Sequence, residues 1–272
     1  MYPALARGHA TAYLNKQRPH SEVMAWFDSP RCRAALSEFD RSTRSKKPGR
    51  VLKRVAPHLK PVFERATIGI WVRPIKIVMT DALSVAQTNA VLDTDGESTP
   101  LFEERSVFLT NGFLQADAER TESFAMTVAN ISHHALQRLI ERDVTTPKDL
   151  PDHVRVILAT ARNIGLLADV VMPRAETQAF LLPYADGALA AVSMRVRPDP
   201  SKPDQTRDVI AVRTWLGPEM LSEEDQRRIK GFDEAMDTML EDDGQAKDWL
   251  RGNALPWRLA PERLKETEAN EA

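Results

Sequence analysis

The sequence contains a single cysteine, Cys32, and no long uninterrupted run of apolar residues. One cysteine cannot form an intrachain disulfide or a cysteine-rich zinc site, which excludes disulfide-stapled scaffolds and zinc-finger-like folds. A membrane-spanning helix needs about 18 or more consecutive apolar residues, and no such run is present. The first residues also lack the basic start and apolar run of a signal peptide. These absences predict a soluble, cytoplasmic protein with no membrane association.

Several motifs of well-known enzyme classes are also missing. The chain has no Gly-x-Gly-x-x-Gly, no Walker sequence and no His-Glu-x-x-His, which argues against nucleotide-driven motors and zinc metalloproteases. No metal-ligand cluster is visible, so we predict no metal and no cofactor. What is present is an ordinary globular composition of 272 residues, 42% hydrophobic and 28% charged. Such a chain can bury a core and is not globally disordered.

Charge is unevenly distributed along the chain although the net charge is only −2. Residues 41–76 contain eleven Lys or Arg and one acid, and residues 219–272 contain fifteen acids and eight bases. This asymmetry is typical of a nucleic-acid-binding patch with an acidic tail. It is also found where two segments are simply solvated, or where they pair with each other. The candidate nucleic-acid contacts in the basic segment are Lys46, Lys47, Lys53 and Arg54.

Patterning divides the chain into three consecutive parts. Residues 1–66 are predicted to form a basic, helical segment, with a break between helices at Ser29-Pro30. Residues 67–218 are predicted to form an α+β domain, and residues 219–272 an acidic helical segment. The expected fold class is therefore α+β: an antiparallel sheet with packed helices, an N-terminal helical segment and a C-terminal helix.

The expected strands follow from β-branched runs and turn residues. We predict strands at Ser123–Ile131, Ala179–Tyr184, Ala188–Val196 and Asp208–Leu216. The Ala-Asp-Gly at 185–187 predicts a tight hairpin, and Thr110-Asn-Gly predicts another. Ser222 is expected to cap one amphipathic helix over residues 221–241.

A helix over residues 133–142 carries the functional part of the sequence. Ser132 can cap it, and Leu136, Leu139 and Ile140 cluster on one side, where they would dock the helix on the core. The opposite side carries His134, Arg138, Glu141 and Arg142. His133 falls near the apolar edge, so it is predicted to be the structural histidine of the pair.

An imidazole beside two guanidinium groups suits phosphate chemistry. Arginine binds phosphoryl oxygens through two parallel hydrogen bonds, and histidine transfers protons near neutral pH. His134 and Arg138 are one turn apart and can touch. The alternative interpretation is a solvated polar face on which Glu141 pairs with an arginine.

The segment Ser132-His-His-Ala-Leu-Gln-Arg-Leu-Ile-Glu-Arg142 resembles the His-Ala-x-x-Arg-x-x-x-Arg helix of a small uncharacterised bacterial domain family. That family is grouped with the barnase/EndoU/RelE-like nuclease and toxin folds. The order of elements that follows is also similar: a second helix, a hairpin, and a last strand with a hydroxyl residue before an aromatic. The resemblance covers about residues 123–218.

The resemblance implies that His134, Arg138 and Arg142 line a cleft and that Thr214 faces them from the sheet. His134 would act as general acid or base, the two arginines would hold phosphate, and Thr214 would orient the substrate. Arg213 would point to the opposite face of a regular strand, so at most one of Arg213 and Thr214 belongs to the site.

Three hypotheses follow. The first is a metal-independent ribonuclease or toxin-like phosphodiesterase, to which the basic segment guides RNA by charge. The second is a non-catalytic nucleic-acid- or protein-binding accessory protein of a mobile element or phage. The third is an interaction protein that docks a protein partner on its acidic C-terminal helix. An exposed cleft around His134 would favour the first. A buried His134, or Arg138 and Arg142 engaged by Glu or Asp, would favour the others.

Overall fold

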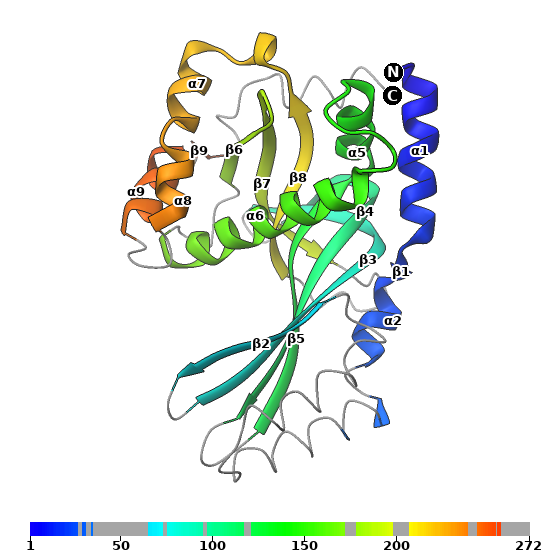
Figure 1. Ribbon diagram of the computed structural model, residues 1–272, viewed down its shortest axis with the longest axis vertical. Coiled ribbons are helices and arrows are strands. Elements are labelled where there is room, and N and C mark those ends of the chain that lie inside the picture. The colour runs from blue at the N-terminus through cyan, green and yellow to red at the C-terminus, as the bar shows by residue number, and fades with distance from the viewer. Residues whose placement is uncertain are drawn as a thin grey trace. The chain divides into compact units, whose positions relative to one another are not determined.

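The computed structural model describes residues 1–26, 29–30, 34, 65–72, 75–94, 97–116, 121–171, 178–197, 207–238, 244–253 and 255–256. Figure 1 labels the helices and strands of these residues. The chain divides into two units whose segments alternate along the sequence. The first unit contains residues 1–14, 87–106 and 129–272, and the second contains residues 15–86 and 107–128. Three long strands contribute to both units: β3 (Ile75–Thr94), β4 (Glu97–Ala116) and β5 (Thr121–Ser132).

The sheet of the first unit is built around a hairpin and a returning strand. β7 (Gly187–Arg197) pairs antiparallel with both β6 (Gln178–Tyr184) and β8 (Arg207–Leu216). The end of β3 also pairs antiparallel with β7, and the short β9 (Leu255–Pro256) pairs with β6. The predicted antiparallel pairing of the last strands is confirmed, and the fold is α+β.

The sheet is mixed rather than antiparallel throughout, which corrects the expected description. The end of β5 runs parallel to β8, with Ala129 opposite Ile210 and Ile131 opposite Val212. The chain between these strands passes through two helices and the β6–β7 hairpin. A connection of that length can cross over and return in the original direction, which a tight hairpin cannot do.

The hairpin between β6 and β7 depends on a glycine immediately after its turn. Ala185, the first turn residue, has a φ of 54°. A Cβ on Gly187 would lie 2.1 Å from the carbonyl oxygen of Leu216 and 2.7 Å from the Trp215 ring. Gly187 therefore permits the close approach of β8, and the hairpin predicted at 185–187 is confirmed.

The helices of the first unit lie against this sheet. α5 (His133–Glu141) and α6 (Leu150–Val171) both contact β8, and α7 (Glu223–Ile229) contacts β6. α8 (Phe232–Thr238) and α9 (Gly244–Asn253) contact each other, and the 3₁₀ turn η2 (Pro218–Met220) follows β8. Leu136, Leu139 and Ile140 of α5 are completely buried, so the predicted docking face is confirmed.

The second unit contains β1 (Arg18–Pro19), α2 (His20–Ala25) and β2 (Arg65–Val72). β2 pairs antiparallel with β3, β1 pairs parallel with it, and β4 lies between β3 and β5. His20 is buried, shares a 2.9 Å hydrogen bond with Ser84, and its ring lies 5.4 Å from that of Phe108.

Three local predictions need correction. Thr110-Asn111-Gly112 is not a turn, because β4 runs through it, and Thr110 and Asn111 are buried there. The helix expected over residues 221–241 is interrupted between α7 and α8, where Gly231 has a φ of 80° that ends a helix. The N-terminal helical segment is interrupted earlier than the predicted break at Ser29-Pro30. The helix α1 (Pro3–Lys16) ends before the short strand β1.

Candidate functional site

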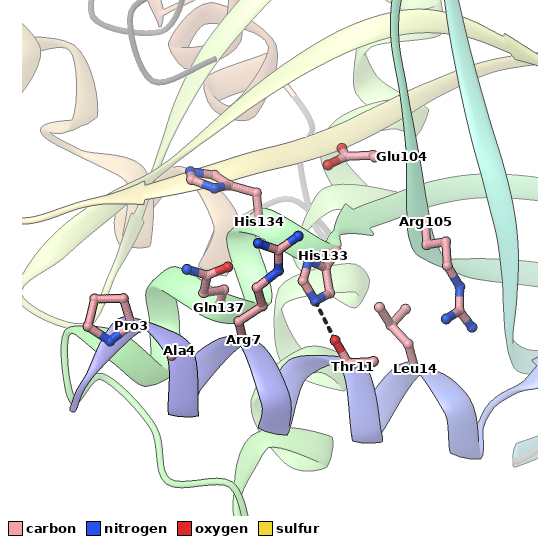
Figure 2. Close-up of a pocket in the computed structure, with 10 residues that line it drawn as sticks. All are labelled: Pro3, Ala4, Arg7, Thr11, Leu14, Glu104, Arg105, His133, His134 and Gln137. Carbon is pink, nitrogen blue, oxygen red and sulfur yellow. Dashed lines mark hydrogen bonds between the residues drawn. The ribbon is translucent and has the colours of Figure 1, made fainter. Parts of the chain in front are cut away.

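A cavity of about 710 Å³ lies within the first unit, between α1, α5 and β4 (Figure 2). Its size suits a ligand of nucleotide dimensions, since small-molecule sites enclose roughly 300–1,000 Å³. α1 contributes residues spaced about one helical turn apart, and α5 contributes residues of its first two turns. β4 contributes one acidic and one basic side chain. The lining residues are Pro3, Ala4, Arg7, Thr11, Leu14, Glu104, Arg105, His133, His134 and Gln137.

Ser132 fixes the start of α5 and thereby places both histidines. Its buried Oγ accepts a hydrogen bond from the Ala135 amide at 2.9 Å and donates one to the Arg213 carbonyl at 2.9 Å. The first contact is an N-cap, and the second ties the cap to β8. The helix therefore begins at His133, and its positive dipole end lies at the cavity.

α1 lines the cavity with a mixed polar and apolar face that lies beside its buried face. Ala6, Ala10 and Tyr13 are buried and recur at helical spacing. Arg7 and Thr11 are also one turn apart, on the face that lines the cavity. The spacing of Arg7 and Thr11 is visible in the sequence, but nothing there indicates what this face lies against.

His133 is held by α1 and lies in a positive field. Its Nε2 shares a 3.0 Å hydrogen bond with the Thr11 hydroxyl. Burial lowers the pKa of His133, and the charges of Arg7 and Arg105 lower it further, against an opposing hydrogen bond with the main chain of Arg7. His133 thus favours its neutral form. Its anchoring agrees with the predicted structural role, but it also lines the cavity.

His134 lies on the same cavity wall and is half-buried. Figure 2 shows the Arg7 side chain extending from α1 toward the two imidazoles, with Gln137 beside them. The cavity therefore gathers two imidazoles and a guanidinium from segments more than 120 residues apart in sequence.

The other predicted site residues lie outside the cavity lining. Arg138 forms a 3.0 Å ion pair with Glu141, and Arg142 forms a 3.5 Å ion pair with Glu219. Thr214 is buried in β8, with 3% of its surface exposed. Of the four residues predicted to converge, the structure brings only His134 to the cavity. The alternative sequence interpretation, in which Glu141 pairs with an arginine, holds for Arg138.

Arg213 and Glu104 were not selected from the sequence as a pair. Their side chains form a largely buried ion pair, and Glu104 lines the cavity. β8 departs from regular register beside Arg213, between the pairings of Ala190 and Ala191. Because β8 is irregular here, the simple alternation of faces expected for residues 213 and 214 does not apply.

The basic candidates Lys46, Lys47, Lys53 and Arg54 lie outside the described residues. Among the residues that the structure does describe, no group of three His, Cys, Asp or Glu side chains could hold a metal ion. No helix in this described part combines the length and apolar character that crossing a membrane requires.

Comparison with known proteins adds no assignment. No family model matches the chain, and neither the curated proteins nor the solved structures contain a match. The resemblance of residues 123–218 to nuclease and toxin folds therefore stays a hypothesis.

Proposed function

We propose that the chain is a metal-independent phosphodiesterase that cleaves RNA, with His134 as the proton-transferring residue. The observation that carries the proposal is the position of His134 in an open cavity together with a second imidazole and cationic side chains. Histidine can exchange protons near neutral pH, and a cationic wall attracts the phosphodiester.

The reaction that fits these groups is internal transesterification of RNA. A base removes the proton of the 2′-hydroxyl, whose oxygen attacks the adjacent phosphorus. The bond from phosphorus to the 5′-oxygen breaks, and an acid delivers a proton to that leaving oxygen. The products are a 2′,3′-cyclic phosphate and a free 5′-hydroxyl. His134 performs one of these proton transfers, which contribute typically 10²–10⁴-fold each.

The test is incubation of the purified full chain with mixed-sequence RNA in excess chelator. The wild type should cleave, and His134→Ala should reduce the rate by about 10²–10⁴-fold. His9→Ala is the matched control, because His9 is a histidine of the same unit that does not line the cavity. The proposal is overturned if the wild type leaves RNA intact, or if His134→Ala cleaves as fast as the wild type.

A second candidate is a non-catalytic nucleic-acid- or protein-binding protein. It is favoured by the ion pairs of Arg138 and Arg142, which engage the guanidinium groups of α5 with Glu141 and Glu219. A protein partner would then dock on the acidic C-terminal segment. RNA that is bound but not cleaved would select this candidate.

Nucleic-acid binding by the basic segment has its own signature. Each phosphate neutralised releases counterions, so affinity should fall steeply with salt. Replacing Lys46, Lys47, Lys53 and Arg54 together by Ala should weaken binding to all RNA sequences about equally and reduce the salt dependence. Binding that is unchanged in this variant would leave the segment as a solvated linker.

A further inference from the structure

We propose that Arg7 of α1 binds the phosphate of a nucleotide-sized ligand, against the imidazoles of His133 and His134. This inference rests on the proposed function. It assigns phosphate binding to Arg7 of α1 instead of to Arg138 and Arg142 of α5. Arg7 would contact the ligand directly, and Thr11 would act as a positioning residue that fixes the His133 ring.

The geometry favours Arg7 over the arginines of α5. Arg138 and Arg142 form ion pairs with Glu141 and Glu219, outside the cavity lining. Arg7 lines the cavity and forms no ion pair within the part of the chain that the structure describes. A guanidinium without a carboxylate partner keeps its donors available for two parallel bonds to a phosphate.

The electrostatics of the cavity point to an anion. Arg7 and Arg105 both act on His133, and Glu104, the acid in the lining, is paired with Arg213. The start of α5 adds its positive dipole end on the same wall. A phosphate placed here would offset the two arginines, so binding should raise the pKa of His133.

The volume points to a ligand larger than free phosphate. Inorganic phosphate would fill only a small part of about 710 Å³, whereas a nucleotide matches the usual size of such sites. The apolar lining residues, Pro3, Ala4 and Leu14, leave a surface that a base or ribose can cover.

The experiment is calorimetric titration of the full chain with uridine 3′-phosphate, uridine and inorganic phosphate. The nucleotide should bind, uridine should bind far more weakly, and phosphate should lie between them. Arg7→Gln should raise the Kd for the nucleotide about 10–100-fold, because a charge-assisted contact is lost. Arg155→Gln is the control: Arg155 is an exposed arginine on α6 that pairs with Asp152 outside the cavity.

A second readout needs no substitution. The His133 ring is followed by NMR while pH is varied, with and without uridine 3′-phosphate. Bound nucleotide should raise its pKa. The proposal is overturned if the wild type does not bind the nucleotide, if Arg7→Gln changes the Kd by less than tenfold, or if binding leaves the His133 titration unchanged.

These outcomes separate the phosphate site from catalysis. Nucleotide binding that depends on Arg7, in a protein that leaves RNA intact, keeps the site and removes the phosphodiesterase. RNA cleavage that is lost in His134→Ala but retained in full by Arg7→Gln keeps the phosphodiesterase and removes Arg7.

Discussion

Removal of the Ser132 hydroxyl is the sharpest test of how the fold places the candidate site. Ser132→Ala removes two contacts: the N-cap to the Ala135 amide and the hydrogen bond to the Arg213 carbonyl. Loss of an N-cap costs about 0.5–2 kcal/mol, and an ordinary hydrogen bond contributes about 1 kcal/mol. Because Ser132 is fully buried, water cannot readily replace either contact. We therefore expect a loss of about 2–3 kcal/mol in the free energy of unfolding.

Ser222→Ala is the matched control at another helix start. Ser222 caps α7 through a 3.1 Å contact with the Asp225 amide, but it is less buried than Ser132. The Asp225 carboxylate accepts from the Ser222 amide at 2.9 Å, a contact that survives the substitution, and from the Ser222 hydroxyl at 2.7 Å, a contact that is lost together with the cap. Because Ser222 is only partly buried, water can replace the lost contacts, and the substitution should cost about 1 kcal/mol or less.

The assay is urea unfolding followed by far-UV circular dichroism and tryptophan fluorescence. Agreement between the two probes in each variant would justify a single free energy of unfolding. A smaller cost for Ser132→Ala than for Ser222→Ala, or two variants as stable as the wild type, would contradict this role of Ser132.

Three further substitutions test particular contacts. The pKa of His133 lies below 6.5 in the folded chain, so the unfolded chain binds more protons as pH falls. The free energy of unfolding should therefore keep its full value above pH 6.5 and decline below it. His133→Gln should remove this pH-dependent contribution from acid-unfolding curves. Asn130 is fully buried, and its side-chain amide atoms find no hydrogen-bond partner among the described residues. Asn130→Leu should therefore raise the free energy of unfolding in urea by about 1–3 kcal/mol. A lower free energy of unfolding would contradict this. Gly187→Ala should destabilise by at least about 1–3 kcal/mol, because its Cβ would overlap the Leu216 carbonyl; an unchanged melting temperature would be the contrary result.

The elements of the first unit that follow local rules were predictable from the sequence. Ser132 before an apolar stripe indicates a capped helix, and Leu136, Leu139 and Ile140 indicate its buried face. The β6–β7 hairpin follows from a turn between two β-rich runs. Each of these signals lies within one segment of the chain, so no knowledge of distant partners is needed.

Local signals failed where burial or a distant strand decided the outcome. Thr110-Asn111-Gly112 has turn-like residues, but it lies inside β4, which has β3 and β5 as its neighbours in the sheet. The parallel pairing of β5 with β8 depends on the path of about 75 intervening residues, which no single-segment pattern encodes.

The candidate site shows the same division. Helical periodicity placed His134, Arg138 and Arg142 on the polar side of α5, and only His134 reaches the cavity. The partners of the two arginines, Glu141 and Glu219, decide between a phosphate-binding face and an ion-paired one. Glu141 was visible as a competitor because it lies on the same helix, whereas Glu219 follows β8 and is brought near only by folding.

The sequence by itself therefore determined the α+β class, the capped helix and the presence of a histidine on its polar face, because these depend on spacing within a segment. The tertiary structure alone decided that α1 packs beside that helix and that Arg7 and Thr11 meet the two histidines. Residues 7 and 133 lie far apart in the sequence, so no local pattern links them. Their proximity follows from the packing of α1, whose buried residues lie beside the face that meets the start of α5.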